Sequence, residues 1–241
     1  MKNQGLKILF LIAAMIGSMQ LIGCSKDTAE DYTVTADESA AIIEKIAAEA
    51  ILVDSCINAL LVEPLSEAEI DALNTMREEE LLAKDVYVAL YALYNVPVFN
   101  NISKSETQHA SAVGSLIVKY GLPDPALNHV AGVFVNADLQ ALYTSLVAQG
   151  STSLISAFTV GATIEDLDIN DLQNHIATDV DNQDILFVFG NLDRGSRNHM
   201  RAFNRQLKAQ GVTYTPQFIS QEFFDQIIST PNETGTGVCP N

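Results

Sequence analysis

The chain has 241 residues and carries 30 acidic against 13 basic side chains, which gives a formal net charge of −17 at pH 7. Such a charge repels phosphate groups, so it excludes electrostatic binding of nucleic acid and of anionic lipid headgroups, whereas it attracts cations. With 48% hydrophobic residues, the chain is long enough to bury a sizeable core without disulfide staples.

The first 23 residues have the pattern of a secretory leader. A basic start at Lys2 precedes an apolar segment over residues 8–15, and the leader ends in Leu-Ile-Gly before Cys24. This ending resembles a bacterial lipobox, so we expect residues 1–23 to be removed as a lipoprotein signal peptide and Cys24 to become the acylated first residue. The domain is expected to be lipid-anchored in the cell envelope, outside the cytoplasm. In a double-membrane bacterium, Ser25 in place of an aspartate would indicate the outer rather than the inner membrane. An uncleaved single-span anchor is the alternative, although the apolar run is short for a span.

Two cysteines remain once Cys24 is lipidated. In an oxidising compartment Cys56 and Cys239 could pair and tie the first helix to the tail. The sequence leaves a disulfide and two free thiols equally open, because it does not give the distance between the two residues.

Helical patterns fill nearly all of the expected mature chain, and the period-two alternation typical of strands is nowhere sustained. A polar tether over 24–38 precedes an Ala-rich accessory helix over 39–62, which Pro64 ends. Ser66 with Glu69 three residues later is typical of a helix start. Further helices are expected over 66–94, 100–120, 136–150, 151–177, 182–210 and 216–228.

Four of these helices are long and fall into two pairs, which a crossover of about thirty residues joins. Long crossovers of this kind occur in ferritin-like bundles, whereas simple up-and-down bundles have short connections. The sequence therefore predicts an all-α fold, with a ferritin-like four-helix bundle over residues 63–229 and extra short helices. Residues 230–241 are expected to form a loose tail.

Glu106 and His109 are three residues apart in a helical segment, which places a carboxylate and an imidazole on one face. The stripe through them is otherwise apolar, so this face is expected to be buried. A metal ion uses both groups at once, because dinuclear iron and manganese bundles bind through inward-facing Glu-x-x-His pairs. An accidental pair on an exposed helix is the alternative, since the motif is weak by itself.

The other three long helices also carry ionisable residues within apolar stripes. Unpaired buried charges would cost several kcal/mol each, and a pair of cations would offset that cost. Carboxylates and imidazoles together suit iron or manganese. In the helix over 66–94 the residue is Glu80, with Glu79 on a neighbouring stripe as the alternative. In the helix over 151–177 it is Glu165, and the stripe continues through Asp168 or Ile169. In the helix over 182–210 it is His199.

These motifs resemble the ferritin-like superfamily. Glu80-x-x-Ala83-x-x-x-Tyr87 is similar to the first-helix motif of rubrerythrin-type proteins, and Glu106-x-x-His109 matches their second-helix motif. A closer resemblance, over residues 64–225, is to an uncharacterised ferritin-like family, the domain of unknown function numbered 2202. Its blocks look like Arg77-Glu-Glu-Glu-Leu-Leu-Ala-Lys-Asp-Val-Tyr87, Tyr120-Gly-Leu-Pro-Asp-Pro125, Ile164-Glu-Asp-Leu-Asp-Ile169 and Arg194-Gly-Ser-Arg-Asn-His199.

The fourth long helix departs from the superfamily pattern. Members with a full di-iron set have Glu-x-x-His there, whereas the residue three before His199 is Ser196, a poor ligand. Asp168 could replace the missing carboxylate, one turn beyond Glu165. The alternative is a relic site whose polar residues bond to one another. The resemblance then implies two iron or manganese ions held by six residues: Glu80, Glu106, His109, Glu165, Asp168 and His199.

The sequence supports three functions. An oxidoreductase would use the metal pair on oxygen, peroxide or ferrous iron; a lipoprotein could bind metal without turnover; and a structural envelope module could carry a degenerate site. His129 and His175 are expected to be solvated, with no metal ligand in the crossover. Expected partners are metal ions and, through Cys24, a membrane. The sequence leaves a homo-oligomer open, and it names neither catalytic residues nor an electron donor.

Overall fold

The computed structural model describes residues 53–235 and residue 239. The predictions for the signal peptide over 1–23, the lipidated Cys24, the tether over 24–38 and most of the accessory helix lie outside the described residues. Residues 53–59 are helical, and the described part contains no strand, although Val130 and Val133 form an isolated bridge. The other helices are α2 (Glu67–Tyr94), α3 (Pro97–Lys119), α4 (Ala137–Gly150), α5 (Leu154–Thr178), α6 (Gln183–Ala209) and α7 (Gln221–Ser229).

Local sequence explains where the first two bundle helices begin. The Ser66 hydroxyl accepts a hydrogen bond from the Glu69 amide (3.1 Å), and the Glu69 carboxylate accepts one from the Ser66 amide (2.8 Å), which is the expected capping box. The second helix starts at Pro97, three residues before the predicted start. Proline is favoured at the first position of a helix, because its fixed φ suits the turn and its missing N–H has no partner there.

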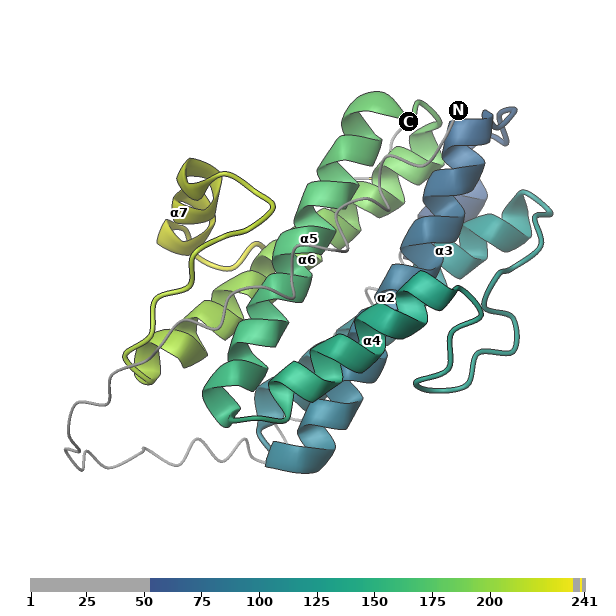
Figure 1. The fold of residues 1–241 in the computed structure, drawn as a ribbon. Helices are drawn as coiled ribbons and strands as arrows, with labels where there is room; N and C mark the ends of the chain where they lie inside the picture. The colour runs from purple at the N-terminus through teal and green to yellow at the C-terminus, as the bar shows by residue number, and fades with distance from the viewer. Residues whose placement is uncertain (1–52, 236–238, 240–241) are drawn as a thin grey trace, which may run out of the picture. The chain divides into compact units, whose positions relative to one another are not determined.

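Two antiparallel helix pairs, α2 with α3 and α5 with α6, form the bundle (Figure 1). The Tyr94 hydroxyl donates to the Gly150 carbonyl (2.8 Å), so α4 ends beside the end of α2. At the other end, the Asn182 amide donates to the Glu69 carboxylate (3.1 Å), so α6 starts beside the start of α2. Helices α2 and α6 therefore run one way, and α3 and α5 the other. This arrangement confirms the all-α bundle, and α4 packs on α2 and α5.

Apolar layers fill the bundle on both sides of its middle. At one end, residues of all four long helices form a cluster that includes Met76, Val113, Leu172 and Leu192. At the other end, aromatic rings pack with centroids 5.3–5.8 Å apart; they belong to Tyr87, Phe99, Phe158 and Phe203. On each of the four long helices, the predicted ligand residues lie between these two layers. None of the helices in the described part is long and apolar enough to cross a membrane.

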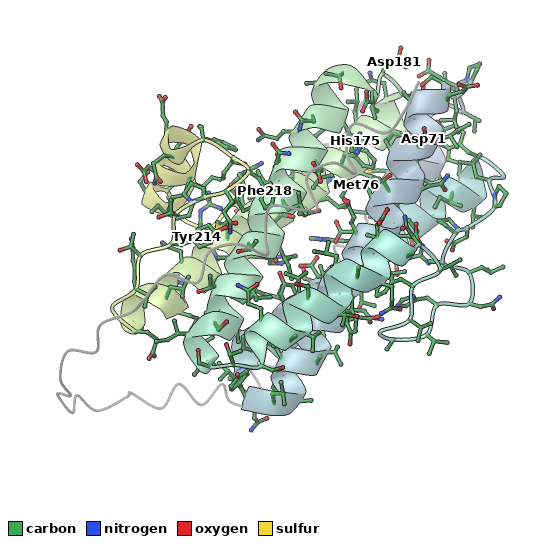
Figure 2. The ribbon with its side chains drawn as sticks, in the orientation of Figure 1. Asp71, Met76, His175, Asp181, Tyr214 and Phe218 are labelled. Atoms are coloured by element: carbon green, nitrogen blue, oxygen red, sulfur yellow. A yellow bond between two sulfur atoms is a disulfide. The ribbon has the colours of Figure 1, made fainter. Side chains whose placement is uncertain are left out.

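The chain after α6 is fastened to the outer side of α5 by one buried carboxylate. Asp166, which is fully buried, accepts hydrogen bonds from the Tyr214 hydroxyl (2.9 Å) and from the backbone amides of Gln217 (2.5 Å), Phe218 (3.3 Å) and Ile219 (2.9 Å). Figure 2 shows Tyr214 and Phe218 in the segment between α6 and α7. This segment therefore covers α5 on the side away from the bundle centre.

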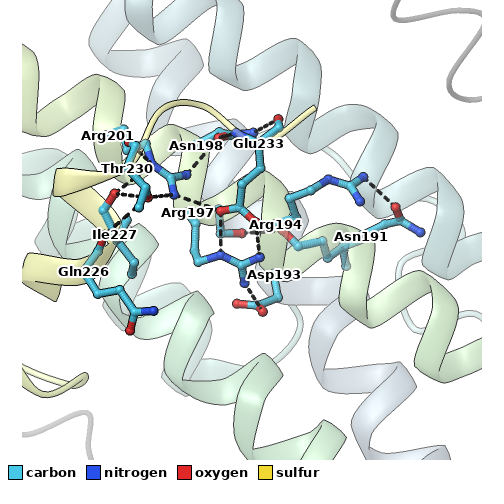
Figure 3. Close-up of polar contacts among 12 residues, drawn as sticks. Asn191, Asp193, Arg194, Arg197, Asn198, Arg201, Gln226, Ile227, Thr230 and Glu233 are labelled. Atoms are coloured by element: carbon cyan, nitrogen blue, oxygen red, sulfur yellow. Dashed lines mark hydrogen bonds and ion pairs between the residues drawn. The ribbon is translucent and has the colours of Figure 1, made fainter. Parts of the chain in front are cut away.

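The start of the predicted loose tail is held against α6. Glu233 accepts charged hydrogen bonds from Arg197 (2.6 and 2.9 Å) and from Arg201 (2.9 Å), as Figure 3 shows. The Asn198 side chain bonds both the amide and the carbonyl of Glu233, at 2.9 Å each. Further along, a disulfide joins Cys239 to Cys56, with their Cα atoms 5.5 Å apart.

We expect Asp166→Ala to lower the free energy of unfolding by about 3 kcal/mol, because it leaves several buried donors without an acceptor. Chemical denaturation measures this change. Asp225→Ala is the matched control, since this exposed carboxylate accepts one hydrogen bond, from Gln221, and its loss should cost less than about 0.5 kcal/mol. Equal losses in the two variants would show that Asp166 does not anchor the segment.

Candidate metal centre

The structure brings five of the predicted ligand residues together in the middle of the bundle. They form two groups of three, and within each group the candidate ligand atoms lie within 4.8 Å of one another. Glu106 belongs to both groups, so the two groups overlap. One group contains Glu80, Glu106 and His109, and the other contains Glu106, Glu165 and His199.

Each imidazole lies between two carboxylates. His109 Nδ1 is 2.7 Å from Glu106 Oε2 and 3.2 Å from Glu80 Oε2. His199 Nδ1 is 2.9 Å from Glu106 Oε1 and 3.4 Å from Glu165 Oε2. The two rings are stacked with centroids 5.5 Å apart. Each oxygen of Glu106 therefore contacts a different histidine, and this carboxylate connects the two groups of three.

Several atoms of the site are buried without a hydrogen-bond partner. Glu80, Glu106 and Glu165 are only 1–2% exposed and His199 9%. Within the described part of the chain, Glu80 Oε1, both carboxylate oxygens of Glu106 and His199 Nδ1 make no hydrogen bond. Buried polar atoms are normally satisfied, so such a set needs an explanation. A metal ion would accept lone pairs from all of these atoms, and the carboxylate and imidazole donors fit iron or manganese.

Burial and mutual charge shift the protonation of the site. Burial raises the pKa of Glu80 to about 8. Burial also acts to raise the pKa of Glu106, but His199 and His109 outweigh it and hold this pKa well below its usual range. For His199, burial acts to lower the pKa, and the carboxylates of Glu106 and Glu165 outweigh it, so the pKa rises to about 10. Without metal, the imidazoles therefore carry protons that a metal must displace.

Two neighbouring residues set the positions of ligand side chains. The Tyr87 hydroxyl donates to Glu165 Oε1 at 2.5 Å and so orients this carboxylate from within the aromatic layer. At Gly195 a Cβ atom would lie 2.6 Å from His109 Cε1 and Nε2, so the missing side chain lets α6 approach the ring. The role of Gly195 was not predicted, and the available signal was a glycine inside a helix, where it costs about 1 kcal/mol.

The other candidate residues lie at the edge of the site or outside it. The buried Ser196 hydroxyl donates to the Asp168 carboxylate and to the Leu192 carbonyl (3.0 Å). Asp168 belongs to neither group of three. Glu79, the alternative to Glu80, is also outside both groups, and burial and Asp171 raise its pKa well above the usual range. The bundle therefore turns Glu80 rather than Glu79 toward the ligands.

The prediction that His129 and His175 are solvated is wrong. His129 Nε2 lies 2.7 Å from Asp85 Oδ2, and Asp85, only 2% exposed, also accepts the Gly132 amide at 2.7 Å. His175 Nδ1 lies 2.7 Å from Asp179 Oδ2. In each case a nearby carboxylate binds the ring. The Asp85 contacts attach the crossover segment to α2.

The fold and the site define an all-α bundle protein with a buried carboxylate and imidazole cluster compatible with a metal centre. Residues 69–231 match the family described as an uncharacterised protein domain (DUF2202), and the chain belongs to this family. It is 50% identical over 179 residues to the uncharacterised protein MJ0754 of Methanocaldococcus jannaschii, covering 74% of this chain and 96% of that protein. A crystal structure of the hypothetical protein MJ0754 aligns with a TM-score of 0.71, covering 72% of this chain and 99% of the other.

We expect the metal-free protein to become less stable as the pH rises from about 5 to about 9. The pKa of Glu80 rises to about 8 on burial, and that of His199 to about 10 through its carboxylates. Both groups thus hold protons in the folded state that the unfolded chain has released, and the stability that these protons confer is lost as they dissociate. Melting temperatures of chelator-treated protein across this range test the sign.

Glu80→Gln should flatten the part of this decline between about pH 4.5 and 8, because the amide does not titrate. Protein loaded with metal should show the opposite trend at low pH, since metal and protons compete for the same atoms. A melting temperature of the metal-free protein that rises toward pH 9 would contradict these assignments.

Proposed function

We propose that the protein is a ferritin-like metalloprotein whose bundle holds a dinuclear iron or manganese centre. The observation that carries this proposal is the sharing of Glu106 between two groups of ligand-type side chains. Glu80 and His109 would complete one metal site, and Glu165 and His199 the other. A carboxylate shared by two cations would lower their mutual repulsion. Two separate mononuclear sites would not need a shared carboxylate.

The ferritin-like part of the proposal is supported by chain direction. The crossover through α4 returns the chain to the end where α2 finishes, so α3 and α5 run parallel. Bundles with one long crossover have this connection, and their metal ligands project inward from all four helices. Ser196 stands where a full di-iron set has a glutamate, which leaves the site of Glu165 and His199 with fewer protein ligands.

We further propose that the centre acts as an oxidoreductase on oxygen, peroxide or ferrous iron. A bound pair of redox-active ions would supply electron transfer and polarisation of an oxygen ligand. The protein residues hold and orient the ions: the three glutamates supply negative charge, and Tyr87 fixes Glu165 by its 2.5 Å hydrogen bond. The apolar layers on both sides of the site keep bulk water away.

A metal-binding or structural module without turnover is the second candidate. The observations that favour it are the direct contacts within the cluster, because His109 already bonds Glu80 (3.2 Å) and Ser196 already bonds Asp168. Metal analysis of protein purified without chelator separates the structural module from the metal-binding candidates. Peroxide reduction and ferrous-iron oxidation, measured on metal-loaded protein, then separate an enzyme from a passive binder.

We expect Glu106→Gln to lose both ions, because this carboxylate serves both groups, whereas Glu165→Gln should lose about one. Elemental analysis after loading and desalting gives the stoichiometry. Chelation should lower the melting temperature of the parent protein and barely change that of Glu106→Gln. The matched control is His129→Ala, which removes a half-buried imidazole in the crossover and should keep the parent stoichiometry. Equal metal loss in Glu106→Gln and His129→Ala would contradict the bridging role.

We propose that the mature protein is anchored to the cell envelope through lipidated Cys24, with the bundle outside the cytoplasm. The motif before Cys24 and the disulfide between Cys56 and Cys239 support this placement, since disulfides persist in oxidising compartments. Mass spectrometry of the native amino terminus should find an acylated Cys24, and Cys24→Ser should shift the protein from the membrane to the soluble fraction. An unmodified start downstream of Cys24 would refute the anchor.

A further inference from the structure

A pocket lies between α2 and the crossover segment that precedes α4. Its cavity volume is about 410 Å³, and residues of the segment from Asp124 to Val135 form most of its wall, with Glu78 and Leu81 contributed by α2. Small-molecule sites commonly have volumes of about 300–1,000 Å³. The pocket shares no residue with the two groups of three in the bundle centre.

The wall of this pocket is apolar and open to solvent. Leu127, Val130, Val133 and Val135 are 74%, 62%, 58% and 95% exposed, and all four lie within nine residues of the chain. Exposed apolar side chains that gather around a hollow mark binding sites more often than scattered ones do. Phe134, by contrast, is buried and forms part of the same wall.

The segment around the pocket is held in place by polar contacts with α2. Asp124 accepts hydrogen bonds from Arg77 at 3.1 and 3.2 Å, and Asp85 binds both His129 and the Gly132 amide at 2.7 Å. The pocket is therefore preformed, which lowers the entropy cost of filling it. These contacts also use up the charged groups of Asp124 and His129.

Glu78 is the charged wall residue that remains. Among the described residues, no hydrogen bond or ion pair reaches its half-buried carboxylate. Burial raises the pKa of Glu78, and the nearby His129 imidazole opposes this rise. An anionic ligand would be repelled by Glu78 and by the net charge of −17. A neutral apolar ligand would cover the carboxylate without pairing it, which is costly. A cationic group with an apolar body satisfies both the wall and the carboxylate.

We propose that this pocket binds a small alkylamine, with its ammonium group on Glu78 and its alkyl chain against Leu81, Val130 and Val133. The ligand is thus a monovalent organic cation of low molecular mass. Binding of the alkylamine does not require metal in the bundle centre. A test of this pocket is therefore independent of the proposed dinuclear site.

Hexylammonium is the probe, and 1-hexanol is its uncharged counterpart of the same length. Methyl-resolved NMR titration of the full chain should show hexylammonium shifts concentrated on Leu81, Leu127, Val130 and Val133. The affinity for 1-hexanol should be at least about tenfold weaker, because a charge-assisted hydrogen bond is lost. Glu78→Gln should weaken hexylammonium by a similar factor and leave the binding of 1-hexanol unchanged.

The matched control is Asp71→Asn, which removes one charge from an exposed position of the same helix. It should leave the affinity for hexylammonium within about twofold. Glu78→Asp keeps the charge and should retain measurable binding, which shows that loss in Glu78→Gln is not a folding defect. Equal weakening in Asp71→Asn and Glu78→Gln, or shifts spread over the whole acidic surface, would overturn the proposal in favour of unspecific cation attraction.

Discussion

The carboxylate of Glu106 imposes the strongest constraint on this bundle. It is 2% exposed, and both of its oxygens face imidazoles that come from different helices. A charge at this depth is tolerated only if cations or protons lie beside it, and His109 and His199 each bring an imidazole to one of its oxygens. Their approach in turn fixes how closely α3 and α6 pack, and Gly195 provides the space that the His109 ring occupies.

Carboxylates that point away from the bundle centre bind the connecting segments. They thereby help to fix the helices that carry the central carboxylates. Glu165 and Asp166 are adjacent in α5, yet Glu165 faces the ligands while Asp166 binds the segment after α6. In α2, Glu80 faces the ligands, and Asp85 binds the crossover segment through His129 and Gly132. Glu165 and Glu80 would act as metal ligands. Asp166 and Asp85 hold the connecting segments on the helices without contacting the bundle centre.

Sequence patterns predicted the helices and most of the central cluster, because apolar periodicity marks the buried face and an ionisable residue within it stands out. The same patterns could not separate Glu79 from Glu80, since both lie on stripes of similar hydrophobicity and the rotation of α2 depends on its neighbours. The contacts of Asp166 and His129 could not be predicted for another reason. Both are covered by segments distant in sequence, and their partners cannot be deduced from helical spacing.

The disulfide between Cys56 and Cys239 spans 183 residues, so it closes the bundle into one covalent ring. While the bridge is intact, a protease that cuts the exposed crossover segment once produces no separate fragment, because the two pieces remain joined through sulfur. The disulfide likewise connects Cys56 to Cys239 by a path that bypasses the bundle. A pulling force on residues before Cys56 would therefore pass through the disulfide to Cys239. The four long helices would not transmit this force.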